Sequence, residues 1–105
     1  MSNGVGPGSD GDVKEHVEEK VAEPEMFQVV LHNDNYTTME FVVEVLVAVF
    51  HRAIEDATRI MLDVHKQGRG VVGTYTYDIA STKVNTVRDM ARRREFPLRC
   101  TVEPA

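Results

Sequence analysis

Residues 26–42 read MFQVVLHNDNYTTMEFV, and they contain both the first strand and the start of the first helix that the sequence predicts. The opening residues, 26–31, are mostly apolar and partly β-branched and lead into four polar turn-forming residues, which predicts a buried strand that enters a loop. Thr37 stands three residues before Glu40, the spacing of a capping box, and so predicts the start of a helix. The apolar run 41–50 that follows is rich in valine, which alone would favour a strand. The cap and the length of the run favour a helix.

The order of the remaining elements follows from the spacing of apolar residues toward the C-terminus. Apolar positions from 54 to 64 repeat with helical spacing, and Gly68 stands where such a helix would end. Residues 71–77 alternate and are rich in β-branched and aromatic side chains, which predicts a second strand. Apolar positions in 79–91 predict a third helix, and the alternating residues 98–102 predict a final strand. The order β-α-α-β-α-β is that of an α+β fold with helices on one side of a small sheet.

Charge separates the N-terminal quarter of the chain from the rest. The 105 residues carry a net charge of −5, and residues 1–25, with seven acidic residues and two lysines, account for all of it. Residues 26–105 hold ten acidic and ten basic residues and most of the apolar ones. Low hydrophobicity and high charge predict a flexible acidic tail over 1–25, followed by one folded domain over 26–105.

Composition also limits the classes of function. The longest apolar run, residues 45–50, is far shorter than the ~20 residues that a membrane-spanning helix needs. A body without net charge is a poor candidate for nucleic-acid binding, which depends on neutralising phosphates. The single cysteine, Cys100, cannot form an internal disulfide and suits a reducing compartment. We therefore expect a cytoplasmic protein that binds neither nucleic acid nor membrane.

A run of polar side chains in residues 32–37, HNDNYT, is the first candidate for a site. Asn and Asp side chains often satisfy the backbone of their own turn, and that is one interpretation. The other is a cluster of oxygen acceptors at the end of a strand, aimed at a cation, because so many consecutive Asn and Asp residues exceed what one turn needs.

His65, Met39 and Met61 are the next candidates. His65, near the end of the second helix, is either a capping group favoured by the helix dipole or a neutral acceptor at the edge of an apolar face. The two methionines either fill the core or line an adaptable pocket, which Leu98 could close. The histidines and Cys100 lack paired metal-ligand spacing, and nothing places a histidine beside the cysteine. We therefore expect no metal, no cofactor and no catalytic residue.

Four motifs together resemble a known family. They are VVLHNDNYTTMEFV at 29–42, MLDVH at 61–65, ASTKV at 80–84 and PLRC at 97–100, and they cover most of the predicted domain in order. They resemble ClpS, the bacterial N-degron adaptor of the Clp AAA+ protease. The resemblance implies three antiparallel strands packed against three helices, no enzymatic activity, and a monomer. It also implies capture of substrates that begin with Leu, Phe, Tyr or Trp, and their delivery to the Clp unfoldase-protease.

The resemblance further implies three sets of site residues. The set that would bind the free α-amine of a substrate is Asn33, Asp34, Asn35 and His65. The set that would line the apolar pocket for the first side chain is Thr37, Met39, Val42, Met61, Val64 and Leu98. The set that would dock on the N-terminal domain of the unfoldase, ClpA or a relative, is Asp78, Thr82 and Lys83.

Two positions depart from the family pattern, and a second function remains open. Asn35 stands where the family commonly has Asp, which predicts weaker capture of a charged amine. Thr38 stands where Pro is common, and we expect Thr37 to cap the helix instead. The same fold occurs in the C-terminal domain of the ribosomal stalk protein, so an interaction domain that binds a translation factor is the alternative. A hydrolase built on Cys100 and His65 has no supporting spacing.

Overall fold

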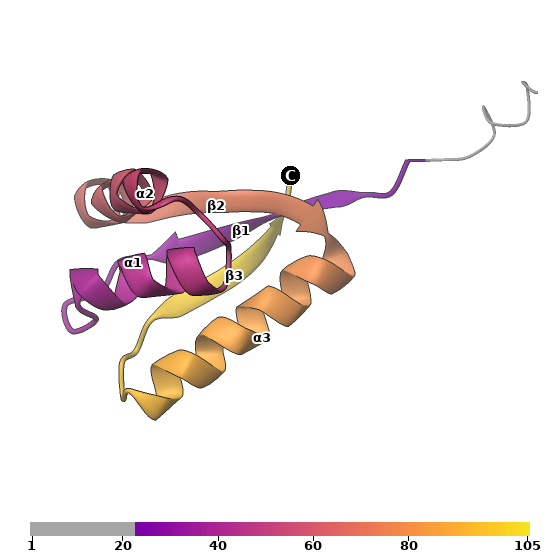
Figure 1. Cartoon of the computed structure of the whole chain (residues 1–105). Helices are drawn as coiled ribbons and strands as arrows, with labels where there is room; N and C mark the ends of the chain where they lie inside the picture. The colour runs from indigo at the N-terminus through magenta and orange to yellow at the C-terminus, as the bar shows by residue number, and fades with distance from the viewer. Residues whose placement is uncertain (1–22) are drawn as a thin grey trace, which may run out of the picture.

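The computed structural model describes residues 23–105 and contains three strands and three helices in the predicted order (Figure 1). The α+β fold is therefore confirmed. The predicted acidic tail lies outside the described residues except for its last three. The elements are β1 (Met26–His32), α1 (Met39–Ala48), α2 (Ile54–Gln67), β2 (Arg69–Thr76), α3 (Tyr77–Arg93) and β3 (Arg99–Pro104).

The sheet is antiparallel throughout, with strand order β2-β1-β3. The first strand is therefore the central one, which explains why its residues Val29, Val30 and Leu31 are fully buried. A bulge interrupts the pairing of β1 with β2 between Val29 and Val30. Because β1 runs through the middle of the sheet, the loop that follows it emerges beside both of its neighbours.

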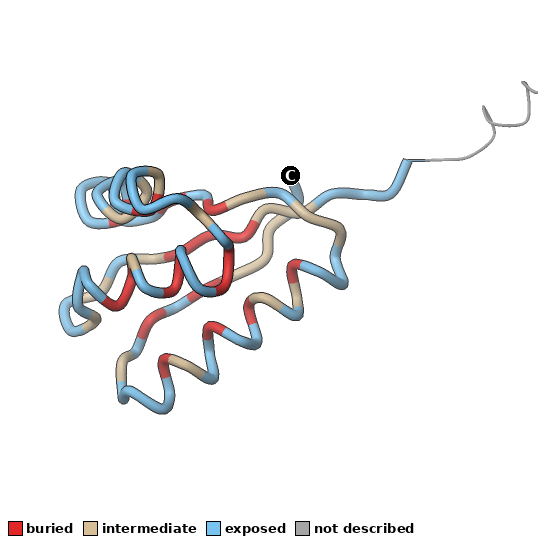
Figure 2. The backbone as a smooth tube through the Cα atoms, in the orientation of Figure 1, coloured by how far each residue is buried: buried red, intermediate tan, exposed pale blue. Residues whose placement is uncertain are grey.

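All three helices contribute to one core on a single face of the sheet, seen as the red segments that face one another in Figure 2. In α3 the buried residues Ala80, Val84, Val87 and Ala91 follow helical spacing, and they form the stripe that packs on the sheet. On the opposite face, Arg69 of β2 pairs with Glu103 of β3 at 2.6 Å, across the central strand. The helices thus lie on one side of the sheet, as predicted.

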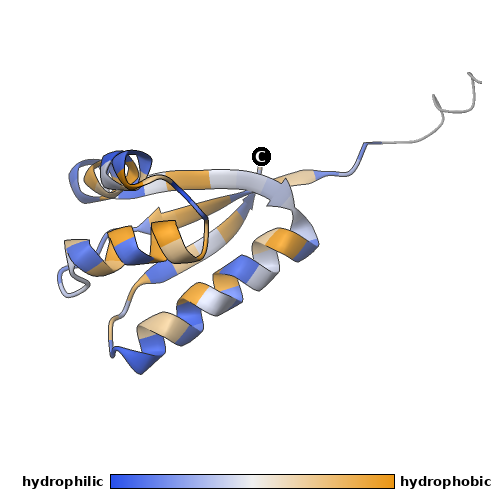
Figure 3. Cartoon of the chain, in the orientation of Figure 1, coloured by the Kyte–Doolittle hydropathy of each residue, from blue (hydrophilic) through white to orange (hydrophobic). Residues whose placement is uncertain are grey.

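Helix α1 is apolar on more than its core face, since every residue in it except Glu40 and Glu44 is apolar (Figure 3). Phe41 and Val45 are buried in the core, as expected. Met39, in contrast, is 42% exposed on the side that faces α2. The apolar residues of α1 therefore serve two surfaces, the core and the space between α1 and α2.

The predicted cap of α1 was wrong by one residue. The helix begins at Met39, and the hydroxyl of Thr38 accepts the backbone N–H of Phe41 at 3.1 Å. The hydroxyl of Thr37 instead donates to the carboxylate of Asp34 at 2.8 Å, so this side chain belongs to the loop. The helix also ends at Ala48 rather than at residue 50, although Phe50 remains in the core.

Candidate functional site

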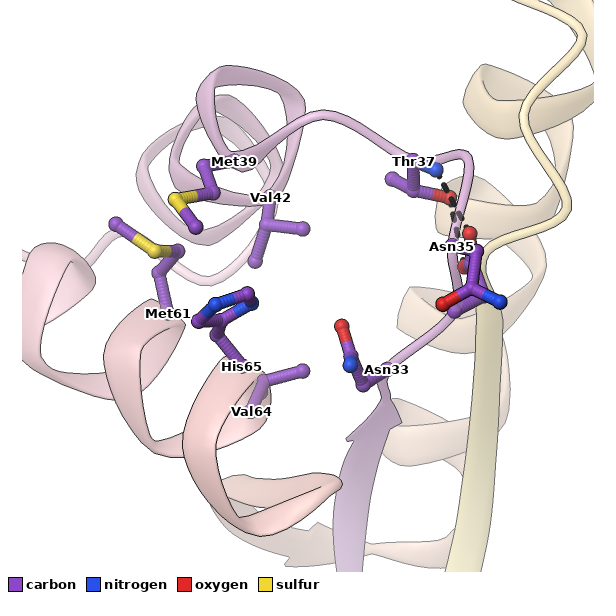
Figure 4. Close-up of a pocket in the computed structure, with 9 residues that line it drawn as sticks. Asn33, Asn35, Thr37, Met39, Val42, Met61, Val64 and His65 are labelled. Carbon is purple, nitrogen blue, oxygen red and sulfur yellow. Dashed lines mark hydrogen bonds between the residues drawn. The ribbon is translucent and has the colours of Figure 1, made fainter.

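A cavity of about 240 Å³ lies between the β1–α1 loop and the facing sides of α1 and α2 (Figure 4). We name it the loop–helix cavity. Two stretches of the sequence meet there, because the loop after β1, together with the start of α1, lies against the C-terminal half of α2. The residues that line it are Asn33, Asp34, Asn35, Thr37, Met39, Val42, Met61, Val64 and His65.

The carboxylate of Asp34 organises the loop. One of its oxygens accepts the backbone N–H groups of Tyr36 and Thr37 at 2.8 and 2.7 Å, and the other accepts the Thr37 hydroxyl. Burial opposes ionisation, but these hydrogen bonds prevail and lower the pKa of Asp34 below its ordinary value of 3.8. Asp34 therefore carries a negative charge beside the cavity at neutral pH while its oxygens are used by the loop.

Two asparagines and a histidine present polar atoms to the same space. Figure 4 shows the carboxamides of Asn33 and Asn35 on the loop side and the imidazole of His65 opposite them. The backbone N–H of Asn33 donates to the carbonyl of Gly68 at 2.9 Å, just after α2. Gly68 adopts a left-handed conformation with φ of 90° and ends that helix. This bond fixes the loop to the end of α2, only three residues beyond His65.

The apolar side of the cavity comes from two helices. Met61, Val64 and His65 share one face of α2 because they are spaced by three and four residues. Met39 and Val42 line the facing side of α1. Val64 is buried, with 2% of its surface exposed, whereas Met39 lies at the mouth. Acceptors at one side and apolar groups at the other make the cavity suited to a ligand that is itself amphiphilic.

Leu98 differs from the other predicted pocket residues. It does not line the loop–helix cavity, and it is buried in the core with 6% of its surface exposed. It directly precedes β3, and its side chain packs in the core between the sheet and the helices. The remaining nine residues predicted for the amine and the pocket all line the cavity.

The sequence interpretation missed an adjoining groove of about 390 Å³, lined by Met39, Glu40, Val43 and Met61. Val43 lies one helical turn beyond Met39, so the spacing of apolar residues in α1 could have indicated it. The two methionines belong to both spaces and separate the groove from the cavity.

The residues predicted for unfoldase docking lie on α3, away from the cavity. Asp78 and Thr82 are exposed, whereas Lys83 is half-buried. The ammonium of Lys83 donates to the carbonyl of Val49 at 2.9 Å and lies 5.7 Å and 5.6 Å from the ring centres of Phe50 and Tyr75. This side chain therefore also connects α3 to the end of α1 and to β2.

Residues 23–105 offer little support for catalysis by the cysteine, for metal binding or for a membrane-spanning helix. Burial raises the pKa of Cys100 to about 12, so its thiol is protonated at neutral pH. His32 bonds to the hydroxyl of Thr101 at 2.8 Å on the sheet face away from the helices. This described part of the chain contains no group of three acidic, histidine or cysteine residues arranged to hold a metal ion. None of its helices combines the length and apolarity that crossing a bilayer requires.

The fold and the cavity together define a small binding domain in which polar acceptors and an apolar wall converge on one space. Residues 22–101 match the family described as the ATP-dependent Clp protease adaptor protein ClpS. The chain belongs to this family. It is thus an adaptor of the Clp protease and not an enzyme, which decides between the two functions that the fold left open.

Two relatives and one solved structure show how close the similarity is. The chain is 60% identical to the ClpS adapter of Syntrophus aciditrophicus over 86 residues, which cover 82% of this chain and 80% of the relative. It is 56% identical to the ClpS adapter of Acetivibrio thermocellus over 92 residues, 88% of this chain and 93% of that one. The fold is also similar to the structure of Agrobacterium tumefaciens ClpS2 bound to L-phenylalaninamide, with a TM-score of 0.77 and 40% sequence identity. The match covers 79% of this chain and 100% of the ClpS2 chain.

Proposed function

We propose that this adaptor captures proteins that begin with Leu, Phe, Tyr or Trp and delivers them to the Clp AAA+ unfoldase. The observation that supports this proposal is the loop–helix cavity, in which amine acceptors and apolar side chains face one space. A chain that starts with a bulky residue has both matching features on adjacent atoms, a free α-ammonium group and an apolar side chain.

The polar side of the cavity suits the ammonium group. An α-ammonium has three N–H donors and no acceptor, so it needs several acceptors from different directions. Asn33, Asn35 and His65 supply them from the loop and from α2, and each charge-assisted hydrogen bond is worth roughly 1.5–3 kcal/mol. Asp34 adds negative potential and holds the loop in shape. An acetylated chain start has neither the charge nor the donors to use this site.

The apolar side suits the first side chain. Val42, Met61 and Val64 form its walls, with Met39 at the mouth and Thr37 on the loop side. Burying a Leu or Phe side chain there contributes roughly 1.5–3 kcal/mol. The ligand of the Agrobacterium tumefaciens relative, L-phenylalaninamide, combines a free α-amine with an aromatic side chain. We propose that Met39 at the mouth clashes with a branch at the ligand's Cβ and so excludes Ile and Val.

The second half of the function is delivery. Asp78 and Thr82 project from α3 and are proposed to contact the N-terminal domain of the unfoldase, with Lys83 at the edge of this surface. The surface lies on a different helix from the loop–helix cavity, so one monomer in the cytoplasm could hold substrate and unfoldase together. Residues 1–25, most of which lie outside the described part of the structure, are proposed to be the segment that the unfoldase engages during transfer.

Three short peptides with the same sequence after the first residue test this function. A Phe-initiated peptide should bind, and its N-acetylated and Ile-initiated counterparts should bind at least about tenfold more weakly in fluorescence anisotropy. The acetylated peptide removes the ammonium group, and the Ile peptide adds the Cβ branch. Equal affinity for all three would refute the proposal.

A further inference from the structure

Gly70, the second residue of β2, is buried where the strand passes beneath α2. It pairs with Leu31 of the central strand. A Cβ atom placed on Gly70 would lie 2.8 Å from Cγ2 of Val64, 3.4 Å from the carbonyl oxygen of Ile60 and 3.6 Å from the backbone nitrogen of Val64. The 2.8 Å distance to Cγ2 of Val64 is shorter than the contacts that Cβ atoms make in real proteins. Among the glycines of the described region only Gly68 has a positive φ, so Gly70 is required for space and not for backbone conformation.

The atom that Gly70 accommodates belongs to the loop–helix cavity. Val64 lines that cavity and is almost fully buried. A valine in a helix has one strongly preferred rotamer, so it cannot turn its methyl group aside at low cost. A side chain at position 70 would therefore displace Val64, and α2 with it, away from β2 and toward the cavity.

The loop part of the amine-binding side is held independently of this contact, whereas His65, which follows Val64 on α2, would move with the helix. His32 pairs with both Arg69 and Arg99, which anchors the base of the loop in the sheet, and Asn33 is bonded to the carbonyl of Gly68. A displacement centred on Val64 thus changes the apolar wall that would contact the first side chain of a substrate, whereas a shift of His65 would weaken every free-amine peptide by the same factor.

We propose that Gly70 is a specificity-determining residue that acts through Val64. Because Gly70 has no side chain, α2 can pack directly on β2, and this packing sets the size of the largest first side chain that the cavity accepts. This inference rests on the proposed function. Gly70 itself touches no ligand, so it is a positioning residue.

The test is Gly70→Ala, measured with three peptides that differ only in their first residue. We expect affinity to fall by about tenfold for Trp and by about threefold for Leu, with Phe between them, because overpacking removes space that only larger side chains need. Loss by one common factor for all three would indicate general damage to the fold and would overturn the inference. An unchanged affinity for all three would overturn it as well.

Gly73→Ala is the matched control, because it makes the same substitution in the same strand. The Cβ of residue 73 would meet the hydroxyl and the ring carbon Cζ of Tyr75 at 2.7 and 3.0 Å and a guanidinium nitrogen of Arg52 at 2.8 Å, and neither of these residues lines the cavity. We expect the ranking of the three peptides to stay as in the wild type. The melting temperature of each variant, measured alongside, separates a loss of fold from a change of preference.

A double-mutant cycle keeps the inference testable if Gly70→Ala folds poorly. Val64→Ala removes the methyl group that the new Cβ would meet, so adding Gly70→Ala to this variant should leave its peptide ranking unchanged. If the two substitutions changed the peptide affinities additively, the contact between residue 70 and Val64 would not be the cause of the change in preference. A wild-type protein that binds acetylated and free peptides equally would instead refute the proposed function, whatever Gly70 does.

Discussion

The residues of the loop–helix cavity and the proposed docking residues of α3 were both predicted from the same family resemblance, yet their surroundings in the structure differ. At the cavity, residues from a loop and two helices converge on one space. On α3, Asp78 and Thr82 project outward, whereas the ammonium of Lys83 turns inward to the carbonyl of Val49. A small ligand has to be surrounded, so its site can be examined in the isolated chain. A docking surface is completed by its partner, so its role has to be tested with the unfoldase present.

The largest effect that separates the two regions is expected from His65→Ala. Loss of one charge-assisted hydrogen bond of roughly 1.5–3 kcal/mol should weaken binding of a Phe-initiated peptide by about 10- to 150-fold. Lys83→Ala, on the other helix, should leave that affinity within about twofold. Fluorescence anisotropy measures both. A His65→Ala protein with wild-type affinity would remove this residue from the amine site.

A second contrast lies within the proposed docking surface on α3. Lys83→Ala removes a hydrogen bond and two cation–π contacts, and it should lower the free energy of unfolding by about 1–2 kcal/mol in urea titrations. Thr82→Ala removes an exposed side chain and should leave stability within about 0.5 kcal/mol. If Thr82→Ala slows degradation of a Phe-initiated reporter by the Clp protease while peptide binding is intact, the surface has a docking role. Unchanged degradation would argue against that role.

A smaller effect is expected from Asn35→Asp, which places an acid where the family resemblance predicts one. An added carboxylate at this exposed position should strengthen binding of a free-amine peptide by about threefold in low salt, and by less at high salt because exposed charges are screened. The N-acetylated peptide is the control, since it has no ammonium to attract. If the affinity for the free-amine peptide does not rise, the charge argument for Asn35 is wrong.

The smallest effect concerns pH and Asp34. Because the pKa of Asp34 is lowered in the folded state, its contribution to stability is complete above its ordinary pKa of 3.8 and is lost as pH falls through the lower folded value. The difference in unfolding free energy between wild type and Asp34→Asn should therefore stay constant from pH 7 to about 5 and shrink in stronger acid. A difference that already changes between pH 7 and 6 would contradict this assignment.

Much of the fold could be predicted because local patterns and tertiary packing agree. The buried run of β1 and the apolar spacing of α2 and α3 were correct, and Gly68 ends α2 as expected. The N-terminal cap of α1 was predicted one residue too early. Two adjacent threonines could each cap the helix, and the choice depends on Asp34, which takes the hydroxyl of Thr37 and leaves Thr38 to cap.

What the amino-acid order alone determined was the sequence of elements and the chemistry available for the site, because periodicity and side-chain type are local properties. Only the tertiary structure decided that Leu98 lies in the core while Val64 lines the cavity, and that Gly70 leaves room for Val64. The physical reason is close packing: whether an apolar side chain fills a core or borders a cavity depends on atoms from distant parts of the chain, and their positions are known only after folding.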